Sequence, residues 1–176
     1  MNDLKHFIEL GVQFAYPFYW KKWEVIHYYA ITFKYKLGVI SGKGIDGTLF
    51  HVADKKLPKL KIIGIGPHKE SIPKALDYDN LQLIIDSPER ASKEFKDDSI
   101  DFVFIDDCTD YESMKKSLNI WESKVHEYGL IMGHNYNHGD IARAVGEYFN
   151  EVWVLPDNVW AGSKVWLRDD RKNFDR

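Results

Sequence analysis

The sequence has 176 residues, a formal net charge of −3 and a single cysteine, and Phe, Trp and Tyr make up 15% of it. This length suits one domain of ordinary size, and one cysteine excludes both an internal disulfide framework and a cysteine-based zinc cluster. Because 24 Lys and Arg nearly balance 27 Asp and Glu, the charge gives no support for a nucleic-acid or membrane partner. The lone cysteine, and a start unlike a secretory signal, favour a cytoplasmic protein.

The first 36 residues differ from the rest because they show no strand pattern and are rich in aromatic residues between positions 14 and 20. Apolar side chains at Trp23, Ile26, Ala30 and Phe33 recur at helical spacing. We expect one helix before Pro17 and a longer one after it, which together form an N-terminal helical cap. The aromatic residues of this cap suit internal packing or contact with a second copy in a homo-oligomer.

Five short runs of Ile, Leu, Val and Phe follow from residue 37 onward. Continuous apolar runs of this length predict strands that are buried on both faces, as in a parallel sheet. The predicted strands cover residues 37–40, 61–65, 81–85, 100–105 and 128–132.

Helix signals lie between these strands. Ser87 and Pro88 provide an N-cap and a first-turn proline. The sequence Thr109-x-x-Glu112 fits a capping box ahead of an apolar stripe with helical spacing. A third amphipathic pattern follows Asp140. The alternation of strands and helices predicts a doubly wound α/β fold.

The last part of the predicted sheet contains no helix signal. Residues 151–155 and 163–168 flank a turn sequence and predict a hairpin. We therefore expect a Rossmann-like α/β fold whose mostly parallel, seven-stranded sheet ends in an antiparallel C-terminal hairpin. The expected organisation is a cap over residues 1–36, an α/β domain over residues 37–170 and a tail over residues 171–176.

Ligands of such sheets bind outside the carboxyl ends of the strands. The loop after the first predicted strand contains Gly42, Gly44 and Gly47 in the spacing G-x-G-x-x-G, which permits a tight turn beside a nucleotide. A dinucleotide site would also need an acidic residue at the end of the second strand, where the chain has Gly66. An NAD(P)-dependent oxidoreductase is therefore supported by the three glycines alone.

Polar side chains follow the other predicted strands. Asp106 and Asp107 are adjacent carboxylates at the end of a buried strand, where stability explains them poorly. Asp86 follows the third strand, and a ligand contact competes there with a local role beside the helix cap. His134 and Asn135 follow the fifth strand and suit metal binding or proton transfer, or equally a polar loop that caps the next helix.

Two segments together resemble a known family. Residues 100–111 (IDFVFIDDCTDY) and residues 129–136 (GLIMGHNY) are similar to motifs of the class I S-adenosylmethionine (SAM)-dependent methyltransferases. The similarity is to small metal-assisted O-methyltransferases of the macrocin O-methyltransferase and cephalosporin hydroxylase groups, and it covers roughly residues 37–167. The resemblance implies SAM as cofactor and methyl transfer to a small-molecule acceptor, most simply a hydroxyl group.

The resemblance also implies a cofactor site. Gly42 and Gly44 would approach the methionine part of SAM, and Gly66 would lie beside its ribose. Asp86 and Ser87 would face the adenine.

The same resemblance assigns residues to chemistry. Asp106 matches an acidic residue that borders the cofactor and holds a divalent metal such as Mg²⁺. His134 and Asn135 match the family's later metal-binding pair. Cys108 stands where the family has an Asp proposed as general base, so the candidate catalytic residues are Asp106, His134 and Cys108.

Several positions depart from the family pattern. Ile40 and Gly66 stand where acidic residues usually hold the cofactor, and Asn135 replaces a metal-binding Asp. One carboxylate with His and Asn offers Mg²⁺ few hard oxygen ligands, and neighbouring carboxylates raise the pKa expected for Cys108. Two interpretations follow: an active methyltransferase, or a catalytically impaired protein of the same fold that acts as a SAM-binding or interaction module.

Overall fold

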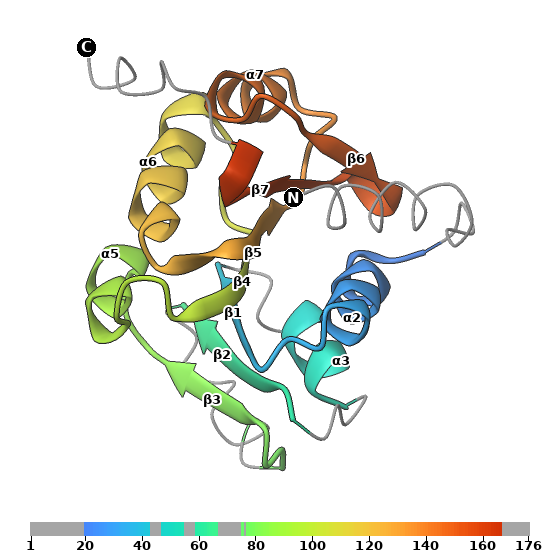
Figure 1. The fold of residues 1–176 in the computed structure, drawn as a ribbon, viewed down its shortest axis with the longest axis vertical. Helices are drawn as coiled ribbons and strands as arrows, with labels where there is room; N and C mark the ends of the chain where they lie inside the picture. The colour runs from blue at the N-terminus through green and yellow to red at the C-terminus, as the bar shows by residue number, and fades with distance from the viewer. Residues whose placement is uncertain (1–19, 43–46, 55–58, 67–74, 76, 167–176) are drawn as a thin grey trace.

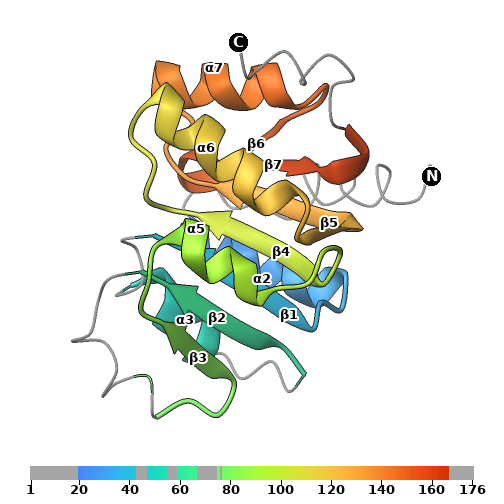
Figure 2. The same ribbon diagram turned by 90° about the vertical axis from the view of Figure 1, so that its left-hand side faces the viewer.

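The computed structural model describes residues 20–42, 47–54, 59–66, 75 and 77–166 of the chain. In this part of the chain a seven-stranded sheet lies between two layers of helices (Figures 1 and 2). The helix predicted before Pro17 and the tail predicted over residues 171–176 lie outside the described residues. None of the helices in the described ranges combines the length and the apolarity that crossing a bilayer requires.

The sheet confirms the predicted Rossmann-like α/β fold. Its strands are β1 (Leu37–Ser41), β2 (Lys61–Ile65), β3 (Leu81–Ile84), β4 (Ile100–Ile105), β5 (Val125–Gly133), β6 (Trp153–Leu155) and β7 (Val159–Ser163). They lie in the order β3-β2-β1-β4-β5-β7-β6, with parallel pairing from β3 to β5 and antiparallel pairing of β7 with both β5 and β6. The order reverses between β1 and β4, and folds of this kind bind ligands beside the carboxyl ends of the strands at that point.

Helices cover both faces of the sheet, as Figure 2 shows. They are α2 (Lys22–Thr32), α3 (Thr48–Asp54), α5 (Pro88–Ala91), α6 (Tyr111–Glu122) and α7 (Gly139–Tyr148), with short 3₁₀ helices η3 (Ser92–Glu94), η4 (Pro156–Asn158) and η5 (Lys164–Trp166). Because side chains alternate along a strand, Ile40 and Phe104 pack with α2 and α3, whereas Val39 and Val103 pack with α5, α6 and α7. Burial on both faces explains the continuous apolar runs in the sequence.

The structure confirms the predicted N-cap of α5, but the N-cap of α6 lies one residue later than predicted. Ser87 caps α5 as predicted, and Pro88 is its first residue. Helix α6 is capped by Asp110 instead of Thr109: the Asp110 carboxylate accepts a hydrogen bond from the N–H of Ser113 over 3.0 Å. The hydrogen bonds from Ser113 lower the pKa of Asp110. The predicted capping box therefore lies one residue early, because Asp is at least as good an N-cap acceptor as Thr.

The closing hairpin is present, but the prediction for its second strand is wrong. That strand is β7 (Val159–Ser163), and the next three residues form the 3₁₀ helix η5 (Lys164–Trp166). Asp157 and Asn158 both have left-handed backbone conformations, with φ of 59° and 55°, and they reverse the chain within three residues. Gly162 gave no strand signal, yet it packs so closely against Phe149 that a Cβ atom would lie 2.7 Å from the ring. Close packing of this glycine adds to the burial of Val159, Trp160 and Ala161 in the same strand.

Candidate functional site

Four residues of the predicted site stand in one row at the carboxyl edge of the sheet. Gly66, Gly42, Asp106 and His134 directly follow β2, β1, β4 and β5. The backbone N–H of each donates to the last carbonyl of the strand before it in the sheet order, over 2.9–3.2 Å. The parallel ladder is thus extended by one residue on each strand, and it places these four residues side by side.

Asp106 is the centre of this row. Its side chain is only 4% exposed, and one carboxylate oxygen, Oδ2, lies 2.6 Å from Nζ of Lys22, the first residue of α2. The other oxygen, Oδ1, lies 3.6 Å from Nδ1 of His134. A buried carboxylate needs such partners, because desolvation of an unpaired charge is costly.

The position of Lys22 is fixed by a second contact. Its backbone N–H donates to Oδ2 of Asp157 in η4 over 2.9 Å. The next residue, Asn158, accepts a hydrogen bond at its carbonyl from the N–H of Tyr136 over 3.0 Å. The start of α2, the β6–β7 turn and the loop after β5 therefore meet beside Asp106.

The end of β1 offers a narrow turn and buried hydroxyl groups. Gly42 has φ of 130°, and a Cβ atom there would lie 2.7 Å from the backbone nitrogen of Asp107, so only glycine fits. Ser41 and Thr48 are 1% and 2% exposed, and within the described ranges their hydroxyl oxygens have no hydrogen-bond partner. Unpaired buried hydroxyls beside a glycine turn fit a polar ligand. Gly44, also predicted for this site, lies outside the described residues.

Asp86 and Ser87, at the end of β3, have local partners. Oδ1 of Asp86 accepts from the backbone N–H of Ser87 over 2.7 Å and lies 3.8 Å from the guanidinium group of Arg90. The hydroxyl of Ser87 caps α5 through the N–H of Arg90. Helix capping accounts for these contacts, and the expected approach of Asp86 and Ser87 to an adenine stays a prediction.

Cys108 lies below the row, in the core between β4 and α6. Its thiol is buried and donates hydrogen bonds to Ser117 Oγ over 3.3 Å and to Asp107 Oδ1 over 3.5 Å. Burial, followed by the charge of Asp107, raises the pKa of Cys108 to about 12. A thiol with this pKa is a poor proton acceptor at neutral pH, so the structure argues against the predicted role of Cys108 as general base. Burial also raises the pKa of Asp107.

The predicted metal ligands do not fit a magnesium site. Asp106, His134 and Asn135 supply one carboxylate, one imidazole and one amide, whereas Mg²⁺ prefers an octahedral set of hard oxygen ligands. Lys22 already places a positive charge 2.6 Å from the single carboxylate. Among the residues that the structure describes, no three His, Cys, Asp or Glu side chains are grouped closely enough to hold a metal ion.

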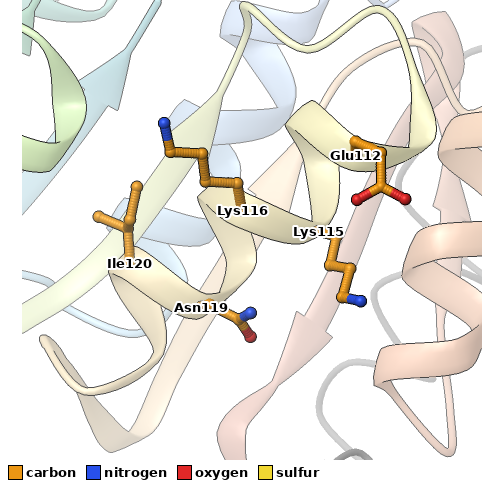
Figure 3. Close-up of a pocket in the computed structure, with 5 residues that line it drawn as sticks. All are labelled: Glu112, Lys115, Lys116, Asn119 and Ile120. Carbon is orange, nitrogen blue, oxygen red and sulfur yellow. The ribbon is translucent and has the colours of Figure 1, made fainter. Parts of the chain in front are cut away.

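A separate hollow lies on the outer surface of α6. Figure 3 shows the five side chains that line it: Glu112, Lys115, Lys116, Asn119 and Ile120. All five come from one helix, and Lys116 pairs with Glu89 of α5. None of them belongs to the carboxyl edge of the sheet, so this hollow is not part of the candidate site.

Sequence reasoning missed three contributors to the site. Lys22 looks like one of several lysines on the polar side of a helix, and its pairing with Asp106 spans 84 positions. Ser41 is indistinguishable in sequence from a loop serine. Asp157 looks like an ordinary turn residue, although one signal was available: Asp and Asn tolerate left-handed backbone, and here they are adjacent.

Solved structures share this fold. A methyltransferase from Geobacter sulfurreducens matches with a TM-score of 0.64 and 14% identity, over 91% of this chain and 88% of that one. A proposed caffeoyl-CoA O-methyltransferase from Staphylococcus aureus matches with a TM-score of 0.60 and 12% identity, over 90% of both chains. Spermidine synthase from Thermotoga maritima matches with a TM-score of 0.54 and 17% identity, over 81% of this chain and 60% of that one.

These likenesses identify the fold as that of the class I methyltransferases. No protein-family model and no curated protein matches the sequence. Since a spermidine synthase has the same fold, the architecture alone does not assign the reaction.

Proposed function

We propose that this protein binds SAM at the carboxyl edge of its sheet and transfers the methyl group to an oxygen atom of a small-molecule acceptor. The observation that carries the proposal is the row formed by Gly66, Gly42, Asp106 and His134 on four neighbouring strands. This row stands where the strand order reverses, which is the ligand-binding position of such folds. Several solved structures of the same fold are methyltransferases by name.

The residues present fit SAM as a ligand. The buried, unpaired hydroxyl of Ser41 and the turn at Gly42 suit the polar methionine part of the cofactor, with Gly44 following in the same loop. Gly66 would lie beside the ribose, and Asp86 with Ser87 would border the adenine. The carboxylate of Asp106 balances the charge of Lys22, so this part of the site carries no net positive charge against the cationic sulfur of the cofactor.

When bound, SAM supplies a methyl group on a sulfonium centre, which leaves as a neutral thioether once an oxygen has taken the methyl. Such a displacement depends mainly on alignment of the acceptor oxygen with the methyl group. His134 provides the proton acceptor: with Nδ1 protonated and turned toward Asp106, its Nε2 carries the lone pair that receives the acceptor's hydroxyl proton. The Asp106 carboxylate, 3.6 Å from Nδ1, favours that tautomer.

A second candidate function is a SAM-binding module without catalysis. It is favoured by the thiol of Cys108, which occupies the position of the family's proposed base yet is buried and held protonated. In this case the cofactor binds, but no acceptor is methylated.

Isothermal titration calorimetry with SAM and with S-adenosylhomocysteine tests the first step. We expect saturable binding of both to the wild type, and weaker binding of SAM to Asp106→Asn because the ammonium of Lys22 then lacks a balancing negative charge beside the cationic sulfonium. The matched control is Asp97→Asn, which removes an exposed carboxylate from the loop before β4 and should leave binding unchanged. Absence of binding at about 1 mM ligand contradicts the proposal.

The transfer step is tested with methyl-labelled SAM and a panel of phenols and alcohols. Label in an ether product supports the enzyme, provided that His134→Ala reduces the rate at least about 100-fold while SAM still binds. Binding without label transfer to any member of the panel supports the second candidate instead.

A further inference from the structure

We propose that the ammonium group of Lys22 is the resident cation of the candidate site and takes the place that a divalent metal would take beside Asp106. The catalytic consequence of this inference rests on the function proposed above, whereas the cation assignment itself is testable without SAM.

The burial of Asp106 calls for a positive charge beside it. Asp106 is 4% exposed, and a carboxylate buried to this extent requires a positive partner at short range. The ammonium of Lys22 supplies it over 2.6 Å, and the Lys22 side chain is only 24% exposed. A divalent ion on the same carboxylate would lie within a few ångströms of this ammonium, and the repulsion in a poorly solvated site would be large.

The position of the Lys22 side chain is fixed by the surrounding structure. Lys22 is the first residue of α2, and its backbone is anchored to Asp157 through a 2.9 Å hydrogen bond. Three residues further on, the same helix enters the core through Val25 and Ile26, both fully buried. The base of the Lys22 side chain is therefore fixed on two sides, and its ammonium group is directed at Asp106 by the docking of the helix.

The groups around Asp106 suit an ammonium better than a metal ion. Besides Asp106, the nearest predicted metal ligands are the imidazole of His134 and the amide of Asn135. These groups make a poor site for a hard cation, but an ammonium needs only the one carboxylate. The amide of Asn135 and the ammonium of Lys22 thus both favour a built-in cation over a bound metal beside Asp106.

The consequence concerns the acceptor. An ammonium carries three N–H donors, and in the described part of the chain one of them is directed at Asp106. A further donor can hold the acceptor oxygen and stabilise negative charge on it as its proton leaves. Because this contact needs a single oxygen, we expect acceptors with one isolated hydroxyl group to be methylated as well as those with two adjacent ones.

Titration with Mn²⁺, followed by electron paramagnetic resonance, tests the cation assignment directly. The variants are Lys22→Met, the charge-preserving Lys22→Arg, and Lys21→Met, which removes an equal charge from the adjacent exposed residue. We expect the wild type, Lys21→Met and Lys22→Arg to bind Mn²⁺ no tighter than about 1 mM, and Lys22→Met to bind it about tenfold tighter. Micromolar binding by the wild type, or equal binding by the wild type and Lys22→Met, overturns the proposal. Circular dichroism and thermal unfolding establish that each variant is folded.

The rate of methyl transfer provides a second test of the role of Lys22. Wild type and Lys21→Met should keep their rate within about twofold when metal is removed with a chelator, and Lys22→Met should lose about 100-fold in rate with little change in SAM affinity. A rate that collapses on chelation overturns the proposal. If no variant binds SAM, the proposed function fails, while the Mn²⁺ titration still decides whether Lys22 is the cation.

Discussion

The indole ring of Trp160 lies against Gly133 so closely that a Cβ atom at residue 133 would come within 2.5 Å of Trp160 Cζ2. The indole N–H of the same residue donates to the carbonyl oxygen of His134 over 3.2 Å. Strand β7 therefore fixes the last residue of β5 by shape and the next one by a hydrogen bond. The position of the His134 backbone depends on the closing hairpin.

This packing predicts that Gly133→Ala destabilises the protein. The added methyl group would have to displace a fully buried indole, and overpacking of this kind costs about 1–3 kcal/mol in the free energy of unfolding. Urea unfolding measures the loss. Gly146→Ala is the matched control, because a Cβ atom at residue 146 in α7 meets no atom within 4 Å. That substitution should raise the free energy of unfolding by about 0.5–1 kcal/mol, since alanine favours helices.

A second prediction concerns the opposite end of the sheet, where Asp101 joins β4 to the start of β1. Its Oδ2 accepts from the backbone N–H groups of Lys36 and Leu37 over 2.6 and 2.7 Å, and its Oδ1 lies 2.9 Å from Nε2 of His126. Asp101→Ala removes an acceptor from all three, and we expect it to lower the free energy of unfolding by about 2 kcal/mol. Asp97→Ala, which removes an exposed carboxylate paired with Lys124, should cost clearly less. Equal losses would contradict the structural role of Asp101.

The third prediction is a pH dependence of opposite sign at two carboxylates. Burial raises the pKa of Asp107 in the folded protein. Between the ordinary pKa and this raised pKa, the folded protein therefore binds more protons than the unfolded protein. The free energy of unfolding falls as pH rises through this range. Asp107→Asn removes that penalty. Its stability relative to the wild type should increase between pH 3 and pH 7, roughly the range over which carboxyl groups titrate.

Asp110 is the control for this measurement. Hydrogen bonds from Ser113 lower its pKa, so its contribution to stability is present above the ordinary pKa and is lost as pH falls through the folded one. The stability of Asp110→Asn relative to the wild type should therefore decrease as pH rises. Chemical unfolding at several pH values measures both differences, and slopes of the same sign would contradict the assigned environments.

The fourth prediction uses the single cysteine. Because the Cys108 thiol is 3% exposed and its pKa is raised to about 12, the folded protein should react with a thiol reagent such as DTNB far more slowly than the unfolded protein at pH 8. The unfolded protein should release one equivalent of product at once.

Cys108→Ala should also keep the rate of methyl transfer within about twofold of the wild type. Loss of transfer in a folded, SAM-binding Cys108→Ala protein would restore Cys108 as a catalytic residue.

The strands that are buried on both faces could be predicted, because their sequences are continuous apolar runs. The bounds expected for β2 and β4 agree with the structure, because both are short runs dominated by large apolar residues. The second strand of the hairpin was predicted too late in the chain, because its buried apolar residues Val159, Trp160 and Ala161 are followed by Gly162, whose place in the strand depends on its fit against Phe149. Tight packing around a small residue has no hydrophobic signature in the sequence.

The candidate site was predicted as far as strand order allows. Asp106 and His134 follow neighbouring parallel strands, so the fold class was sufficient to place them together. Lys22 was not predictable, since its contact with Asp106 depends on how an N-terminal helix docks across the sheet. The raised pKa of Cys108 was expected from neighbouring carboxylates, whereas in the structure burial is the larger cause.

The two polar contacts of Lys22 have a consequence for the order of events during synthesis. Its partners, Asp106 and Asp157, lie 84 and 135 positions later in the chain. On the ribosome, α2 emerges long before either carboxylate, and the second of them leaves the exit tunnel only after nearly the whole sheet has been made. The contacts of Lys22 with these two carboxylates thus form last, whereas the capping hydrogen bond from the Lys21 N–H to Glu24 is local and can form with the helix itself.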